Sequence, residues 1–155
     1  MDWNNIPSYA VKKMDKSVKL KDFPHITENG RWITTEDGYW SGGFWVGLLW
    51  FSYNISGDEK YKESAYEWLK RLESKKNDRN MLFDLGFMFY PSFVLGYKIT
   101  NDDYLKEVAL EAADTLLTFF NIAYAHSKRT IEEFVREDYS TIHVMEANNA
   151  TEDIH

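Results

Sequence analysis

The stretch that decides the fold is GFWVGLLWFSYNISGDEKYKESAYEWLKRL, residues 43–72. Its first part, Gly43–Ile55, is apolar on all faces, which predicts an inner helix that is covered on both sides. Gly57-Asp58 then predicts a break and the cap of a second helix. The second helix is amphipathic, and its apolar side chains recur at helical spacing: Tyr61, Ala65, Trp68, Leu69 and Leu72. The stretch therefore predicts a hairpin of one inner and one outer helix.

The same pattern recurs further along the chain. Residues 84–99 are apolar on most faces, and Asn101-Asp102 ends that segment. An amphipathic segment follows, with Leu105, Val108, Ala109, Ala112 and Leu116 on one side. A first helix from Pro7 and a loop between Leu20 and Tyr39 precede both hairpins. The repetition predicts an all-α fold of stacked helical hairpins, as in a solenoid or a partial α/α toroid. We expect one domain over residues 1–146 and a polar tail over residues 147–155.

Composition limits the classes of function. The 155 residues are 17% aromatic and carry a formal net charge of −7 without a basic cluster, which argues against a nucleic-acid partner. The chain has no cysteine, so disulfides and thiolate metal sites are excluded. It shows no segment of signal-peptide character and no apolar run long enough to span a bilayer, so we expect no membrane contact and a cytoplasmic location.

Asp84 is the residue that most suggests chemistry. It is the lone carboxylate in the apolar run MLFDLGFMFY, residues 81–90. A carboxylate removed from water must be paired, hydrogen-bonded or protonated, and each state is useful in acid–base catalysis. The alternative is that Asp84 only caps the helix that follows it. From this run alone the two interpretations have equal weight.

Ordered segments between residues 20 and 120 carry a family resemblance. They are Phe23-Pro24-His25, Gly30-Arg31-Trp32, DGYWSGGFWVGLLW (residues 37–50), Gly57-Asp58-Glu59-Lys60-Tyr61, DLGFMFYPS (residues 84–92) and Ala112-Ala113-Asp114-Thr115-Leu116. Together they resemble the N-terminal part of unsaturated glucuronyl hydrolases, glycoside hydrolase family 88. The resemblance implies an (α/α)6 toroid.

The resemblance also implies an activity, with no metal or cofactor. Enzymes of this family remove 4,5-unsaturated glucuronic acid from lyase-generated glycosaminoglycan oligosaccharides. A carboxyl group protonates C4 of the vinyl ether and helps water attack C5, and the resulting hemiketal opens. Asp84 matches the first of two catalytic aspartates, Trp40 matches a position in the sugar pocket, and His126 matches a histidine near that pocket.

The sequence departs from the family pattern after Asn121. The second family aspartate and its inner helix are absent, as if by an internal deletion, and the segments of the C-terminal half do not follow. Because one carboxylate remains, we expect little or no turnover from this chain alone. The apolar spacing stays in phase across the junction, which predicts one long helix from Leu105 to Glu137.

Other interpretations remain open. An exposed inner face favours a self-associating or partner-binding module without catalysis. An unsaturated rhamnogalacturonyl hydrolase, which shares the toroid and the chemistry, is a further alternative. Without the resemblance, Trp40 is more often a core residue than a ligand platform, and His126 is somewhat more compatible with a satisfied interior histidine. We expect His25 to be structural, the four histidines to bind no metal, and Asp37 and Asp58 to serve turns and caps.

Overall fold

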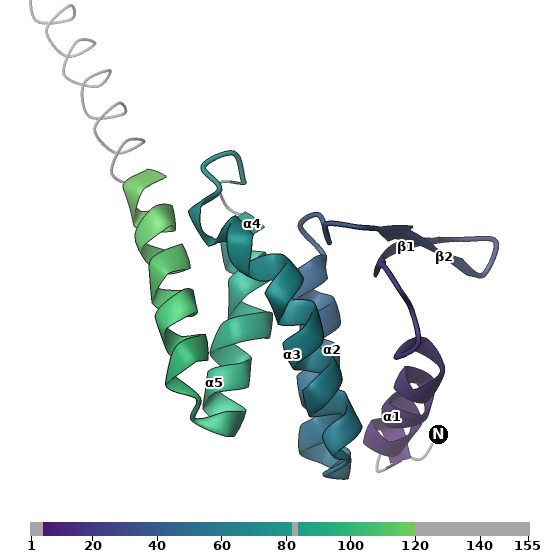
Figure 1. Cartoon of the computed structure of the whole chain (residues 1–155). Coiled ribbons are helices and arrows are strands. Elements are labelled where there is room, and N and C mark those ends of the chain that lie inside the picture. The colour runs from purple at the N-terminus through teal and green to yellow at the C-terminus, as the bar shows by residue number, and fades with distance from the viewer. Residues whose placement is uncertain (1–4, 82–83, 120–155) are drawn as a thin grey trace, which may run out of the picture. The chain divides into compact units, whose positions relative to one another are not determined.

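The computed structural model describes residues 5–81 and 84–119, and residues up to Leu117 form one compact unit. Figure 1 shows the order of the elements. They are α1 (Ile6–Ser17), β1 (Phe23–Glu28), β2 (Arg31–Thr35), α2 (Gly42–Ser56), α3 (Glu59–Leu72), the 3-10 helix η2 (Glu73–Asn77), α4 (Asp84–Phe89), the π-helical segment η3 (Tyr90–Val94) and α5 (Leu95–Thr100). A further helix covers residues 103–119. The fold is all-α with stacked hairpins, as predicted, apart from one β-hairpin.

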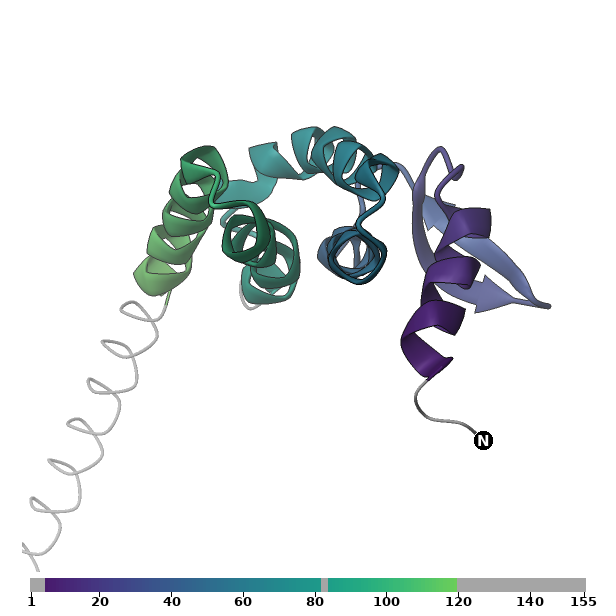
Figure 2. The same ribbon diagram turned by 90° about the horizontal axis from the view of Figure 1, so that it is seen from below.

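The helices form two layers (Figure 2). In one layer α2 packs beside η3 and α5, and in the other lie α3 and the helix over residues 103–119. The predicted inward faces of both outer helices are confirmed where they are buried: Tyr61, Ala65, Trp68, Leu69, Leu72, Leu105, Val108 and Ala112. Burial of these faces against the inner layer supplies the main hydrophobic stabilisation.

Both predicted helix breaks are confirmed. Gly57 ends α2 in the left-handed region at φ 68°, and the Asp58 carboxylate accepts a hydrogen bond from the Lys60 N–H at 3.1 Å. Asn101 ends α5 at φ 57°, and the Asp102 carboxylate accepts from the Tyr104 N–H at 3.0 Å. The two hairpins therefore use the same device of a left-handed cap followed by an aspartate.

The predicted loop between Leu20 and Tyr39 is wrong. β1 and β2 pair antiparallel there, and the turn between them places Asn29 at φ 49° and Gly30 at φ 74°. Two consecutive positive φ angles are typical of the tight turn that Asn-Gly favours between strands. The register shifts between Pro24 and Ile26, so His25 is an extra residue on β1. A bulge of this kind turns a side chain away from its regular direction.

The expected double cover of the inner helix is also wrong for α2. One face of α2 packs in the core, but Phe44, Leu48, Phe51 and Ile55 are 44–53% exposed. Their spacing of three or four residues places them on one stripe of the helix. Among the described residues, no element covers this stripe.

The second inner segment is helical throughout but changes its winding at Pro91. Proline has no N–H for the usual i to i−4 bond, and η3 takes π-helical turns around it. The Trp50 indole N–H donates to the Ser92 carbonyl at 2.7 Å and so links η3 to α2.

The last described residues, up to 119, are helical, and the rest of the predicted long helix lies outside the described residues. No helix in the described part of the chain is long and apolar enough to cross a membrane.

Candidate functional site

A row of exposed aromatic rings connects three elements. Trp40, in the loop before α2, contacts Phe44 edge to face at a centroid distance of 6.3 Å. Phe44 of α2 in turn contacts Phe87 of α4 at 6.1 Å. The three side chains are 43%, 44% and 53% exposed, so solvent reaches each ring. We call Trp40, Phe44 and Phe87 the aromatic row. Rings that are both exposed and held by neighbours can stack against the apolar face of a sugar.

Asp84 precedes Phe87, a member of this row, by one helical turn. It is the first residue of α4, half-buried, and its backbone N–H donates to the Met81 carbonyl at 2.8 Å. Residues three apart on a helix are neighbours on its surface, so Asp84 and Phe87 share one side of α4. No partner of the Asp84 carboxylate lies among the described residues. The carboxylate is therefore available to a ligand on the aromatic row, while its place at the start of a helix also suits a negative charge.

The loop that carries Trp40 is tightly fixed. Tyr39 has a positive φ of 48°, which is uncommon for a non-glycine residue. The Asp37 carboxylate accepts from the Tyr39 N–H at 3.1 Å and pairs with the Lys75 ammonium at 2.8 Å. The hydrogen bond from Lys75 lowers the pKa of the Asp37 carboxyl below its ordinary value. The predicted role of Asp37 in a turn is thus confirmed, and the turn positions Trp40.

His25 reaches the same loop from the bulge in β1. Its Nδ1 lies 2.8 Å from the Ser41 hydroxyl oxygen, and its ring meets Trp40 edge to face at 5.8 Å. The same ring also lies 5.4 Å from that of Tyr39. His25 was expected to be structural, and these contacts place it against the loop that presents Trp40.

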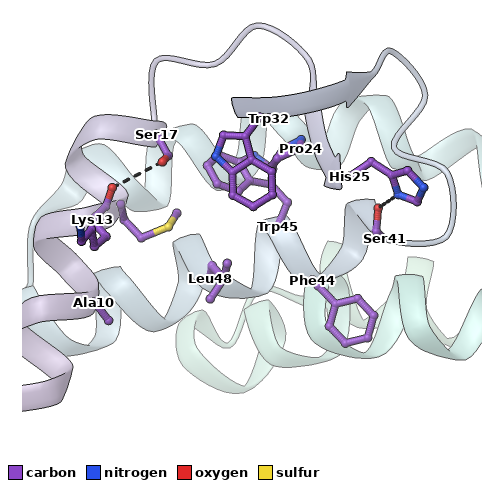
Figure 3. Close-up of a pocket in the computed structure, with 11 residues that line it drawn as sticks. Ala10, Lys13, Ser17, Pro24, His25, Trp32, Ser41, Phe44, Trp45 and Leu48 are labelled. Atoms are coloured by element: carbon purple, nitrogen blue, oxygen red, sulfur yellow. Dashed lines mark hydrogen bonds between the residues drawn. The ribbon is translucent and has the colours of Figure 1, made fainter. Parts of the chain in front are cut away.

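A hollow of about 390 Å³ lies between α1, the β-hairpin and α2 (Figure 3). Its lining surface is mostly apolar. The residues that line it are Ala10, Lys13, Met14, Ser17, Pro24, His25, Trp32, Ser41, Phe44, Trp45 and Leu48. Trp45 is buried at 3% exposure, and its indole N–H has no hydrogen-bond partner in the described part of the chain. The hollow shares Phe44 with the aromatic row and therefore adjoins the candidate site.

The three site residues expected from the sequence have different outcomes. Trp40 is 43% exposed, so it is not a core residue, and Asp84 is half-buried at the start of the helix that carries Phe87. His126 lies outside the described residues, and its role stays a prediction. Sequence reasoning missed Phe44 and Phe87, although their positions at helical spacing from Leu48 and Asp84 were visible. No cluster that could hold a metal ion occurs within the described ranges.

No protein-family model matches the chain. Individual proteins, however, resemble it in sequence. The unsaturated glucuronyl hydrolase of Formosa agariphila is 43% identical over 84 residues, which is 53% of this chain and 20% of the relative. The unsaturated chondroitin disaccharide hydrolase of Streptococcus pneumoniae is 34% identical over 117 residues, which is 70% of this chain and 30% of the relative.

Solved structures resemble the chain in fold. One is an aspartate-to-asparagine mutant of the unsaturated glucuronyl hydrolase from Streptococcus agalactiae, complexed with dGlcA-GalNAc6S. It superposes with a TM-score of 0.62 at 29% identity, over 72% of this chain and 32% of that structure. The chain thus spans between a fifth and a third of the length of the proteins that it matches here. In sequence and in fold, the chain is homologous to part of the unsaturated glucuronyl hydrolases.

Proposed function

We propose that the chain binds the 4,5-unsaturated uronic acid at the end of an oligosaccharide, with the sugar against the aromatic row and Asp84 beside its C4=C5 bond. The observation that carries the proposal is the row itself, in which a loop and two helices bring exposed rings together, with Asp84 one helical turn before Phe87 and its carboxylate without a partner among the described residues. Aromatic faces bind the apolar faces of sugars, and a carboxyl group supplies the proton that a vinyl ether takes up.

The homologues support this substrate class. Their names specify unsaturated glucuronyl and unsaturated chondroitin disaccharide substrates, and one mutant was solved with dGlcA-GalNAc6S. In the proposed chemistry a carboxyl proton adds to C4 and the oxygen of water adds to C5. The proton lost by that water restores the carboxyl group. The hemiketal formed at C5 then opens and releases the next sugar.

We expect this 155-residue chain by itself to turn over little substrate. In the unsaturated glucuronyl hydrolases that the chain resembles, two aspartates share the proton transfers. Of these two, only the first has a match in this sequence, Asp84. A single carboxylate must then deliver and recover the proton without a partner to tune its protonation. Binding and turnover are therefore separate expectations with separate measurements.

Binding is tested by isothermal titration calorimetry with an unsaturated chondroitin disaccharide. Trp40→Ala should raise Kd about tenfold, because it removes one stacking surface. Trp32→Ala is the matched control, since Trp32 is 46% exposed but lies outside the aromatic row. The saturated disaccharide should bind more weakly. Equal affinity of the wild type and Trp40→Ala would contradict the proposal, and tighter binding of an unsaturated rhamnogalacturonan disaccharide would favour the alternative substrate.

Turnover is followed as loss of the vinyl-ether absorbance in the ultraviolet. We expect almost no loss with the wild type and none with Asp84→Asn. A clear rate in the wild type that Asp84→Asn abolishes would show that one aspartate suffices, against the expectation of low activity. The same result would confirm the role of Asp84.

The second candidate function is self-association through the exposed apolar face of the inner layer. Phe44, Leu48, Phe51, Ile55, Phe87 and Tyr90 are each 44–61% exposed. If each side chain exposes about 100 Å² of apolar surface, the six together expose about 600 Å² per copy. A symmetric dimer would then bury about 1,200 Å² in total, which is the lower end of the range for stable interfaces. Sedimentation equilibrium should then find a dimer that Phe51→Glu dissociates. A monomer at every concentration would contradict this candidate.

A further inference from the structure

We propose that His25 is a positioning residue, which holds Trp40 in the orientation that the sugar requires through Ser41 and through its own ring. This inference rests on the proposed function, because the orientation of Trp40 matters only if Trp40 binds the ligand. Nothing in the resemblance assigns a role to His25 beyond its place in a matched motif.

The bulge in β1 explains why His25 can reach the loop. Pro24 pairs with Thr34 and Ile26 with Ile33, so His25 has no partner of its own on β2. An extra residue of this kind bends the strand and redirects its side chain. The His25 imidazole consequently meets Tyr39 and Trp40 rather than the neighbouring strand.

A hydrogen-bond relay then joins the hairpin to the start of α2. The Ser41 hydroxyl donates to the Gly38 carbonyl at 3.4 Å, and its oxygen lies 2.8 Å from the His25 Nδ1, within hydrogen-bond distance. Ser41 is the residue immediately before α2, so one hydroxyl links the strand, the loop and the helix. Figure 3 shows the bond between His25 and Ser41 at the edge of the hollow.

The loop needs this support because its backbone is strained. Tyr39 holds a positive φ of 48° without the freedom of glycine. Such conformations persist only where neighbouring contacts over-determine them, and they concentrate at functional sites. The His25 ring contacts the rings of Tyr39 and Trp40, and the Asp37 carboxylate accepts a hydrogen bond from the Tyr39 N–H. Without the His25 contacts, Trp40 would sample several orientations, and each ligand molecule would have to select one.

The test is a double-mutant cycle on disaccharide affinity, measured by calorimetry. His25→Phe keeps a ring but removes the hydrogen bond, and Ser41→Ala removes its partner. Each should raise Kd about fivefold, and the double variant should be no worse than either, because both remove the same relay. His25→Asn, whose amide lies near the position of Nδ1, should recover part of the affinity, because it restores the hydrogen bond but not the ring contacts. Ser52→Ala, which removes a hydroxyl of α2 that donates to the Leu48 carbonyl at 2.8 Å, should bind like the wild type.

Three results separate the inference from the proposed function. Wild-type affinity in His25→Phe, or additive losses in the double variant, would overturn the role of His25 while the proposed function stands. Absence of wild-type binding would overturn the proposed function. In that case the heteronuclear NOE of the Trp40 indole N–H, assigned with Trp40→Phe, tests the positioning without a ligand. It should fall in His25→Phe and Ser41→Ala and recover in part in His25→Asn, and an unchanged NOE would refute the inference.

Discussion

Asp37 shows how a single exposed carboxylate supports the candidate site from outside it. It accepts the Tyr39 N–H and pairs with Lys75, and both contacts fix the backbone just before Trp40. The Asp37 side chain is 59% exposed, so its ion pair adds little stability in the manner of surface pairs. Its effect is therefore local to the loop.

Asp37→Asn should lower the free energy of unfolding by about 0.5 kcal/mol at pH 7, because the amide can accept the Tyr39 N–H but cannot pair with Lys75. The hydrogen bond from Lys75 holds the pKa of the folded Asp37 carboxyl below 3.8, its ordinary value. In that acidic range the unfolded state binds more protons, so this stabilisation is present above pH 4 and is lost as pH falls through the folded pKa. Urea melts at pH 7 and pH 2.5 check this. A difference between the two proteins that grows in acid would contradict it.

Single residues were predictable where their chemistry was local. Asp58 and Asp102 follow glycine or asparagine at helix ends; Asp58 caps the next helix as expected, and Asp102 does the same at the second predicted break. The contacts of His25 were not predictable, because they depend on a bulge whose register is set by a partner strand. The same holds for Phe44 and Phe87, which meet only once two helices pack together.

At the scale of the helices, α2 and α4 approach closely at Gly43. A Cβ atom at this position would collide with the backbone of Met88, whereas one at Gly86 would meet nothing within 4 Å. Gly43→Ala should therefore lower the free energy of unfolding by about 1–3 kcal/mol, as overpacking does. Gly86→Ala, the matched control, should raise it by up to about 1 kcal/mol, because alanine favours the helix. Thermal melts distinguish the two, and equal melting temperatures would contradict the close approach.

The hydrogen bond between α2 and η3 can be tested by comparing two tryptophan variants of α2. Trp45 and Trp50 are both buried on α2, and among the described residues the Trp50 indole N–H has a partner, the Ser92 carbonyl, whereas the Trp45 indole N–H has none. Trp50→Phe should cost about 1 kcal/mol more than Trp45→Phe, because it removes a buried hydrogen bond to the Ser92 carbonyl. Chemical denaturation measures both. A larger loss in Trp45→Phe would mean that the bond to Ser92 does not stabilise η3.

Elements were predictable where their periodicity was clear. The amphipathic faces of α3 and of the helix over residues 103–119 are buried as the spacing indicated. The hairpin was not predictable from periodicity, because its strands are short and the Asn29-Gly30 turn signal lies among other loop-forming residues. The π-helical turns of η3 could not be predicted from Pro91 alone, since Trp50 holds them from another helix.

At the scale of the whole molecule, the described residues form two hairpins whose inner layer carries the candidate site. Stacked hairpins were predictable because each outer helix has one apolar face. The exposed stripe of α2 was not, since a helix that is apolar on all faces does not indicate which face its neighbours leave open. That open face holds the aromatic row, and a ligand or a second copy of the chain would cover it.

Saturation-transfer difference NMR with the unsaturated chondroitin disaccharide tests the proposed site most directly. Protons of a ligand that lie against aromatic rings receive the most saturation, so the C4 proton of the unsaturated uronic acid should show the strongest effect. Trp40→Ala should abolish most of that effect, and Trp32→Ala should not. An effect that is absent, or strongest on the other sugar and unchanged in Trp40→Ala, would show that the aromatic row beside Asp84 is not where the unsaturated sugar binds.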